Sequence, residues 1–527
     1  MKDNIKTPDM LPDSEKPDCD KSQRTFSAPD VAFAWLSFFF GYLFCRVIPI
    51  YENTLGGFAF VLLIFAVTFA ILKAKKISIP PMALIIGGSA LAISPAIIIT
   101  NNDFLIYLAY CYIIASYCYF IYSSFGNTLE NGVSDFIFMD YIKAIFIMPI
   151  YSIVRIFEAI SYGKAKNTMK QFLKVVSGLA LAAIPTIVIF VLLSYDDGFI
   201  SIFEKIFDFD TETVFSHIGS LIFAVPLGMY IFSLFASSND KILSDKFTAN
   251  DCNRTFISIR IMPQLTALTA ALPILLVYIV YFISQWQYYV SGFTGVLPEN
   301  FSYAIYAREG FFQLCAVSFI NLVVIIAIVL FTKRKNEKTS VLLKILTTVF
   351  CVFTLVLIST AVAKLVMYID TYGLTQKRVY AMWFMALIAA VFVVIAIGKY
   401  VTKIKTIWAS LLVCLVFFTA LSLSNVNGII AEYNVDRYLD GTLDIVDIDA
   451  FNQLEDASVP ALVRLTKTLE QRKEMGEAIP EETYKILKDN LTETASYLQE
   501  FENSIFEFNI PAYRAKSALI EYGLIEK

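Results

Sequence analysis

The first group of residues that could do chemistry is the charged pair Arg308-Glu309, followed by Gly310. This pair leads directly into a long apolar run that begins with Phe311 and Phe312. Charged residues at the mouth of a membrane span could bind a ligand or order a loop. Aromatic residues beside charges are equally typical of an anchor at the lipid headgroups, so both interpretations stay open.

Asn321 is the second candidate, because it lies near the middle of the apolar run 311–331. An amide at that depth costs free energy unless it is hydrogen-bonded, so we expect it to face other helices. It would then hold helices together or line a path for a substrate or an ion.

A third group lies in the short turn between two apolar runs, where Asp370, Gly373 and Arg378 follow Lys364. Lys364 could extend outward to the membrane surface. Arg378 is a cation in a part of the chain where cations are scarce, and a carboxylate such as Asp370 or Glu309 would explain its place. The group is either a functional polar cluster or a structural turn.

The remaining polar features argue against an enzyme. Five aspartates, from Asp436 to Asp449, do not have the spacing of a calcium loop and are better explained as a solvated face. The chain has one histidine, His217, and none of its eight cysteines forms a CxxC pair. Phosphate-binding glycine loops and hydrolase motifs are also missing from the sequence. We therefore expect no metal, no cofactor and no nucleotide.

The elements that position these residues are membrane helices. Of the 527 residues, 57% are hydrophobic and only 17% are charged, whereas soluble domains have about 25% charged residues. The fold class is therefore all-α, a polytopic membrane helix bundle in a lipid bilayer, and a net charge of −4 gives no indication of nucleic acid binding. We predict about eleven spans: 31–50, 56–72, 80–99, 103–123, 172–194, 216–237, 266–288, 311–331, 341–367, 379–398 and 406–423.

The charges of the connecting loops predict the orientation. Alternate loops, beginning with 73–79, hold nineteen lysines and arginines, whereas the loops between them hold four. Basic loops remain in the cytoplasm, so we expect a cytoplasmic N-terminus and an extracytoplasmic C-terminus in the plasma membrane. Residues 1–29 are polar and are predicted to form a disordered cytoplasmic tail.

The stretch 136–161 is apolar enough to resemble a further span. Its residues Asp140, Lys143, Arg155 and Glu158 fall on one helical stripe, which is typical of a helix in the membrane interface. We therefore include it in the transmembrane domain, 30–423, as an interfacial helix with its charged face toward water.

Residues 424–527 have a different composition, with ten basic and twenty acidic residues. Ser458, Pro480 and Pro511 are placed to begin three helices, and Gly476 and Gly523 to end two of them. We predict a small acidic helical domain outside the membrane.

Several motifs resemble a bacterial membrane family of unknown function, domain of unknown function 4173, together with its relative 4153. They are SYAIYAREGFFQL at 302–314, TYGLT at 371–375, IIAEYNVDRYLDG at 429–441, VPALVRL at 459–465 and FNIPAYRAKSAL at 508–519. The resemblance implies a bacterial inner-membrane protein and supplies no reaction. It implies a higher rank for Arg308, Gly310, Asn321, Gly373, Arg378, Asn434 and Arg514 than for other polar residues.

Two functions fit these observations. The favoured one is a non-enzymatic envelope sensor or scaffold, whose domain 424–527 meets a protein partner. The alternative is a transporter or a membrane subunit of an export system, which the prolines within spans and Asn321 motivate. Opposite charges further predict a contact between Arg308 or Arg378 and the acids of the C-terminal domain.

Overall fold

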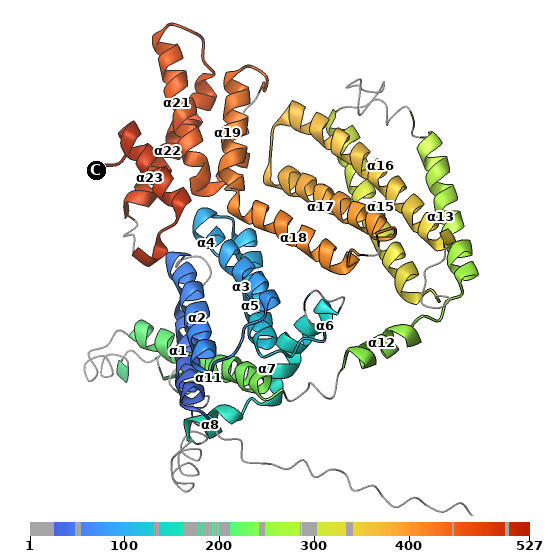
Figure 1. The fold of residues 1–527 in the computed structure, drawn as a ribbon. Helices are drawn as coiled ribbons and strands as arrows, with labels where there is room; N and C mark the ends of the chain where they lie inside the picture. The colour runs from blue at the N-terminus through green and yellow to red at the C-terminus, as the bar shows by residue number, and fades with distance from the viewer. Residues whose placement is uncertain are drawn as a thin grey trace, which may run out of the picture.

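A computed structural model describes the chain from residue 26 to residue 526, with gaps. Outside the described residues lie 48–53, 131, 133–135, most of 162–210, 242–247, 285, 287–302, 334–340, 402, 445–446 and 501–504, and also the side chains of 303–312. The described residues are helical, apart from turns and one isolated bridge between Met262 and Thr332. Ten of these helices are long and apolar enough to cross a membrane (Figure 1). The expected all-α fold of membrane helices is confirmed.

Helices of the first half form one bundle, which we call the first bundle. Its buried core includes Phe33, Phe65, Tyr117 and Phe232. Its helices are α1 (Ala28–Val47), α2 (Thr54–Ala74), α3 (Pro81–Ile93), α4 (Ala96–Ile99), α5 (Asp103–Ser124) and α11 (Thr211–Asn239).

Helices of the second half form the second bundle, which has a separate core around Phe350, Met385 and Phe392. Its helices are α13 (Gln264–Ser284), α15 (Tyr303–Phe331), α16 (Val341–Tyr372) and α17 (Gln376–Gly398). Between the two bundles lies α18 (Thr406–Leu423), which packs on α17 and also contacts α3, α4 and α5.

A close helix crossing in the first bundle joins α1 to α11, and the two run antiparallel. Phe33 packs on Phe235 at one end, and Tyr42 bonds His217 at the other. At the crossing, a Cβ added to Gly41 would lie 2.4 Å from the Ala224 carbonyl oxygen, and one added to Gly228 would lie 2.9 Å from the Phe38 Cα. Small residues allow helix backbones to approach this closely inside a membrane.

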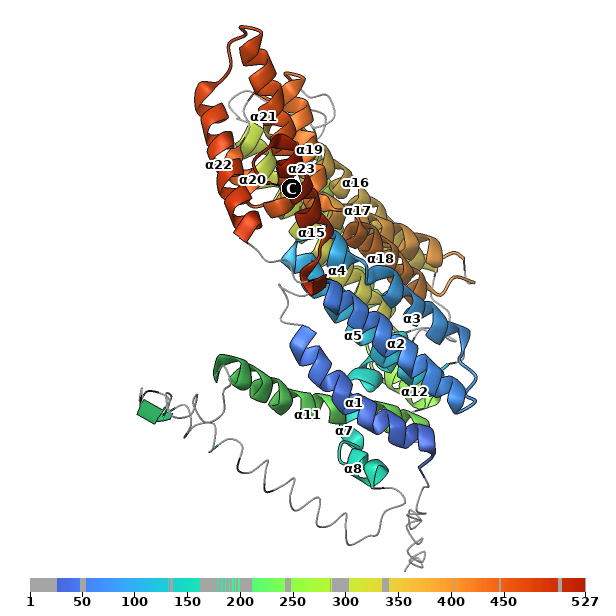
Figure 2. The same ribbon diagram turned by 90° about the vertical axis from the view of Figure 1, so that its left-hand side faces the viewer.

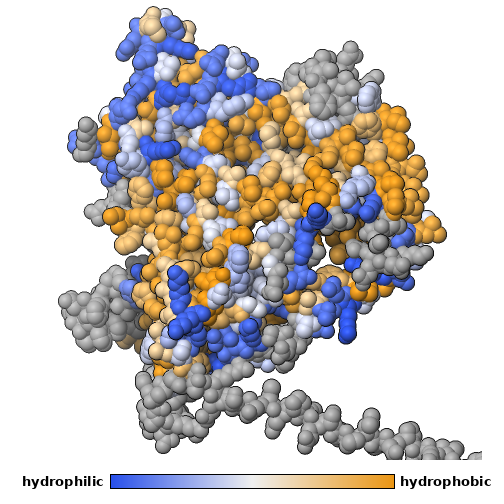
Figure 3. Space-filling model, in the orientation of Figure 1, coloured by the Kyte–Doolittle hydropathy of each residue, from blue (hydrophilic) through white to orange (hydrophobic). Residues whose placement is uncertain are grey.

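The helices have two ends that differ in chemistry. At the basic end lie the start of α1, the turn 75–80, the α5–α6 connection and the turn 399–405, with Lys75 bonded to Asp30 and Lys405 to Glu130. At the domain end lie the starts of α2 and α5, the α16–α17 turn and the end of α18, next to the C-terminal domain. Figure 3 shows an apolar band between two hydrophilic regions on one face.

The span predicted at 172–194 lies largely outside the described residues and stays a prediction. The described residues before and after it lie at opposite ends of the first bundle. Arg155 contacts Asp240 at the basic end, whereas Ser216 contacts Arg46 at the domain end.

The predicted interfacial helix is broken into four pieces: α6 (Ile137–Ile142), a π-helical turn (Lys143–Ile147), α7 (Met148–Tyr151) and α8 (Arg155–Ile160). Its expected orientation, with the charged face toward water, is wrong for Asp140 and Lys143, which are buried against α5. Phe138 and Phe146 are exposed instead. The physical reason is that α5 and the following loop supply hydrogen bonds to Asp140, while exposed aromatic side chains lose nothing beside lipid.

The C-terminal helices are α19 (Val426–Leu439), α20 (Ile448–Asn452), α21 (Val459–Glu474), α22 (Glu481–Glu500) and α23 (Ile510–Tyr522), which stand together beyond the domain end (Figure 2). As predicted, Gly476 and Gly523 follow α21 and α23 with φ of 81° and 91°. A left-handed residue of this kind ends a helix, and glycine adopts it without strain. Asn509 caps α23 by accepting a hydrogen bond from the Ala512 amide at 2.8 Å, and Pro511 is buried in the first turn of the helix.

Candidate functional site

The predicted site residues do not form one cluster. Arg308, Glu309 and Gly310 belong to α15, but their side chains lie outside the described part of the chain. Asn321 is fully buried in the second bundle, where Tyr278 donates to its Oδ1 and its Nδ2 donates to Thr354 at 2.9 Å. It therefore ties α13, α15 and α16 together.

Asn434 and Gly373 do meet, at the contact of α19 with the α16–α17 turn. The Leu374 amide donates to the Asn434 Oδ1 at 2.7 Å, and the Asn434 Nδ2 donates to the Leu374 carbonyl at 2.9 Å. One side chain thus satisfies both backbone groups of one residue. Gly373 has φ of 73°, and a Cβ at this position would lie 2.6 Å from the Asn434 Oδ1. Glycine is therefore required both for the turn and for the close approach.

Arg378 stabilises the same turn from within it. Its guanidinium donates to the carbonyls of Tyr372 and Gly373 and lies over the ring of Tyr368, 4.2 Å from its centroid. These carbonyls end α16, where a cation is favourable. The prediction that Asp370 is its carboxylate partner is wrong, because Asp370 lies near Arg437 instead. The side chain of Glu309, the other predicted partner, lies outside the described residues.

The charges across this junction have the reverse of the predicted signs. Arg437 of α19 donates to the carbonyls of Ile369 and Asp370, and its guanidinium lies 3.8 Å from the Asp370 carboxylate. The cation therefore comes from the C-terminal domain, and the acid comes from the membrane helix. The predicted contact of Arg378 with domain acids is wrong for the described atoms, since Arg378 is bonded to backbone carbonyls that hold it within its own turn.

A chain of amides extends the junction to the first bundle. Gln376 of α17 donates to the Asn427 Oδ1 at 2.9 Å, and Asn427 of α19 donates to the Asn101 Oδ1 at 3.3 Å. Asn101, which precedes α5, donates in turn to Glu455 at 3.2 Å. Burial and the nearby Asp103 and Asp456 carboxylates raise the pKa of Glu455. Both bundles are thus joined through the C-terminal domain.

Arg514 lies apart from this junction. It is exposed on α23, which contacts α4, while the turn Ile505–Glu507 before α23 contacts α2. There Thr54 donates to the Phe508 carbonyl at 2.8 Å.

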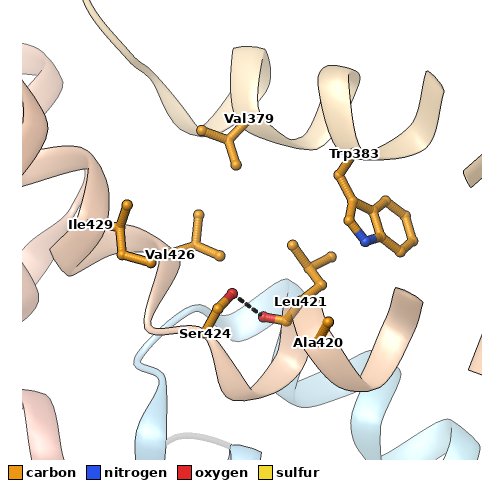
Figure 4. A pocket seen from close by; sticks show the side chains of 7 residues that line it. All are labelled: Val379, Trp383, Ala420, Leu421, Ser424, Val426 and Ile429. Carbon is orange, nitrogen blue, oxygen red and sulfur yellow. Dashed lines mark hydrogen bonds between the residues drawn. The ribbon is translucent and has the colours of Figure 1, made fainter. Parts of the chain in front are cut away.

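An open apolar crevice of about 330 Å³ lies beside the junction, between α17, α18 and the start of α19 (Figure 4). Val379 and Trp383 line one side, and Leu421 and Val426 the other. The Trp383 Nε1 donates to the Phe417 carbonyl at 3.0 Å, so this indole presents only carbon to the crevice. Ser424 also lines the crevice, and its hydroxyl donates to the Leu421 carbonyl at 2.9 Å, so this polar group already has a partner within the chain.

A second polar cluster, at the basic end, was missed by sequence reasoning. The Asp140 carboxylate is buried and accepts hydrogen bonds from the Tyr122 hydroxyl at 3.2 Å and the Leu129 amide at 3.1 Å. Burial raises the pKa of Asp140 to about 6 and lowers the pKa of Lys143, which begins the π-helical turn. Single π-helical turns are frequent at functional sites. The sequence shows that these charges share one side of a helix, but it does not show whether water or protein lies against that side.

Across the described residues, no group of three histidine, cysteine, aspartate or glutamate side chains is placed to hold a metal ion. The geometry at the domain end instead suits a structural joint, because Asn434, Asn427 and Asn101 each form hydrogen bonds with another part of the chain.

The chain was also compared with known protein families, curated proteins and solved structures. A family model described as "Domain of unknown function (DUF4153)" matches residues 83–465, from α3 into α21. The matched region therefore includes the junction and α5, and it extends well before the motifs that suggested the resemblance. No curated protein and no solved structure matches the chain.

Proposed function

On the premise that this chain belongs to the DUF4153 family of unknown function, we propose that it is a non-enzymatic membrane scaffold or sensor. Its C-terminal domain receives a protein partner of the cell envelope and passes the effect of binding to the two bundles. This role needs a domain that contacts both bundles, and it needs no catalytic groups.

The observation that carries the proposal is the joint at the domain end. Asn434 holds the second bundle through Leu374, while Glu455 holds the first through Asn101. Asn427 accepts a hydrogen bond from Gln376 of the second bundle and donates one to Asn101 of the first bundle. A displacement of α19 by a bound partner would therefore act on both bundles together.

The orientation belongs to the same proposal. The basic end faces the cytoplasm of a bacterial cell, and the C-terminal domain lies outside, because lysine and arginine accumulate at only one end. A reporter fused after Lys527 that is active only in the cytosol would contradict this orientation.

Transport ranks second. Asn321 motivated it, and the hydrogen bonds of Asn321 to Tyr278 and Thr354 give that residue a packing role. Its amide is therefore already engaged by protein groups.

The coupling can be measured as a distance between spin labels at Phe104 and Thr371, two exposed residues at the domain ends of the two bundles. We expect truncation after Leu423 to broaden the distance distribution strongly, because the truncation removes the joint. Arg464→Ala, a change on the surface of the C-terminal domain, is the matched control and should leave the distribution unchanged. An unchanged distribution in the truncated protein would rule out coupling through the domain.

Partner binding needs its own test. A photoreactive residue in place of exposed Ile486, on α22, should give one discrete adduct with an envelope protein in living cells. The same residue at Lys76 is the control and should not give that adduct. If no exposed position of the domain gives an adduct, the chain has no stable partner there.

A further inference from the structure

The segment 505–514 carries an unusual set of exposed side chains for a polar, acidic domain. Ile505 is 75% exposed, Phe506 58%, Phe508 40% and Tyr513 62%. The rings of Phe508 and Tyr513 lie 5.8 Å apart, so these two exposed groups are neighbours in space, and Ile505 and Phe506 precede them within three residues of Phe508. Exposed apolar residues that gather in this way mark a binding surface.

The depth of this segment relative to the membrane is fixed by a hydrogen-bonded contact. Thr54 begins the span α2, and its hydroxyl donates to the carbonyls of Phe508, at 2.8 Å, and Glu507, at 3.3 Å. The first residue of a span lies near the boundary of the hydrocarbon core. The backbone of Phe508 therefore lies at headgroup depth, although it belongs to the C-terminal domain.

We propose that the segment 505–514 is a lipid-binding anchor, which inserts Ile505, Phe506, Phe508 and Tyr513 into the headgroup region of the adjacent leaflet. Tyrosine and other amphipathic aromatic residues are enriched at that depth, because one end of the side chain is apolar and the other is wet. The anchor would hold the base of the domain on the membrane while the asparagine contacts hold it on the helices.

Arg514 completes the surface. It follows Tyr513 on the exposed side of α23, whereas Pro511, Ala515 and Leu519 on the opposite side are buried in the domain. An arginine guanidinium forms paired hydrogen bonds with a phosphate. Arg514 therefore suits the phosphate of a lipid headgroup, which gives this exposed residue a role outside the joint.

A protein partner is the less favoured occupant. The segment lies beside the first residue of a span, where the surroundings of an exposed side chain are lipid before any partner arrives. Membrane contact at this place needs no further molecule.

Depth-dependent quenching in the full-length protein tests the anchor. A fluorophore is attached to a cysteine at position 506, in a cysteine-free background, and the protein is reconstituted into vesicles of phosphatidylcholine and phosphatidylglycerol. We expect lipids with brominated chains to quench the 506 label several-fold more strongly than a label at Met475. Met475 is the matched control, because it is 68% exposed but lies at the far tip between α21 and α22.

Three results would overturn the proposal. In the first, brominated lipids quench the 506 label no more strongly than the 475 label. In the second, aqueous iodide quenches the 506 label as readily as it quenches the 475 label. In the third, the 506 label is shielded from both quenchers, which indicates that protein covers it.

Variants separate headgroup contact from simple burial. With the label at 513, Phe506→Asp should reduce bromine quenching several-fold, whereas Phe506→Leu should preserve it. Arg514→Glu should reduce quenching more in phosphatidylglycerol than in phosphatidylcholine vesicles, because the phosphate contact is charge-dependent. An unchanged thermal transition in each variant shows that the domain remains folded, and equal quenching in Phe506→Asp and Phe506→Leu would overturn the anchor.

Discussion

The buried contacts at the two ends of this helical protein differ in charge, whereas the ion pair of Arg437 with Asp370 at the domain end is partly exposed. At the domain end, the described contacts of Asn434, Asn427 and Gln376 are neutral amide hydrogen bonds. At the basic end, buried charges meet: Asp30 with Lys75, and Arg155 with Asp240. Neutral amide bonds keep their strength when salt or pH changes, whereas charged contacts depend on the protonation of their partners.

The difference indicates which end is the fixed base and which is the joint. Removing one partner of a buried ion pair leaves an uncompensated charge, so the basic end resists rearrangement. Each amide bond contributes less, about 1 kcal/mol, so the domain end can open at a moderate cost. In the proposed role, the movable contacts lie where the partner binds.

The largest expected effect comes from Asp30→Ala, which leaves the Lys75 ammonium buried with a side chain only 12% exposed. We expect a loss of about 3–5 kcal/mol of stability, measured by thermal unfolding of the purified full-length protein in detergent. The double variant Asp30→Ala/Lys75→Met should recover most of this loss, because it removes both charges. If the double variant is no more stable than the single one, the pair is not what holds the basic end.

Asp140 should make the basic end sensitive to pH. Burial raises its pKa from an ordinary value of 3.8 to about 6, so the folded protein holds the proton more tightly than the unfolded chain does. The free energy of unfolding therefore falls by about 3 kcal/mol in total as the pH rises from about 4 to about 6, and it levels off at higher pH. Unfolding midpoints between acidic and neutral pH measure this effect. Asp140→Asn should flatten this part of the curve, and an equally steep curve in that variant would assign the effect to another group.

At the domain end, Asn434→Ala should expose the unpaired amide and carbonyl of Leu374. We expect the junction to weaken by about 2 kcal/mol, seen as faster hydrogen exchange in α19 and at Leu374. The effect should be the same at low and high salt, because no charge is involved. Asn434→Asp keeps the acceptor for the Leu374 amide and loses the donor to the Leu374 carbonyl, so exchange at the Leu374 amide should rise less than in Asn434→Ala.

The smallest effect is expected on the surface of the C-terminal domain. Arg464 lies 2.6 Å from both Glu432 and Asp436, and all three side chains are more than two-fifths exposed. Water and salt screen such pairs, so Arg464→Ala should cost less than about 1 kcal/mol and should leave exchange at Leu374 unchanged. A cost equal to that of Asn434→Ala would remove the contrast between surface charges and the buried joint.

The sequence predicted the spans well, because twenty consecutive apolar residues leave few alternatives to a membrane helix. The predicted span 56–72 corresponds to α2, Thr54–Ala74, and the one at 379–398 corresponds to α17, Gln376–Gly398. The span predicted at 341–367 extends to Tyr372, since Gly373 with its positive φ is what ends α16. Hydropathy alone does not detect a helix stop of that kind.

Contacts were harder to predict than helices. Gly373, Arg378 and Asn434 were ranked together, but the partners of Arg378 and Asn434 are backbone atoms, which carry no side-chain signature. The reversed charges of Arg437 and Asp370 show the same limit, because net charge does not determine individual pairs. For Asp140, helical periodicity identified a stripe without indicating whether water or protein lies against it.

The close crossing of α1 and α11 has a consequence for biosynthesis. Phe33 and Phe235 are roughly 200 residues apart, so at synthesis rates of about 5–20 residues per second the first helix waits roughly 10–40 s for its partner to emerge from the ribosome. During that delay, the groove beside Gly41 faces lipid or the insertion machinery. A stalled or truncated chain that lacks α11 would therefore leave this groove open, as a mark by which membrane proteases could recognise an unfinished protein.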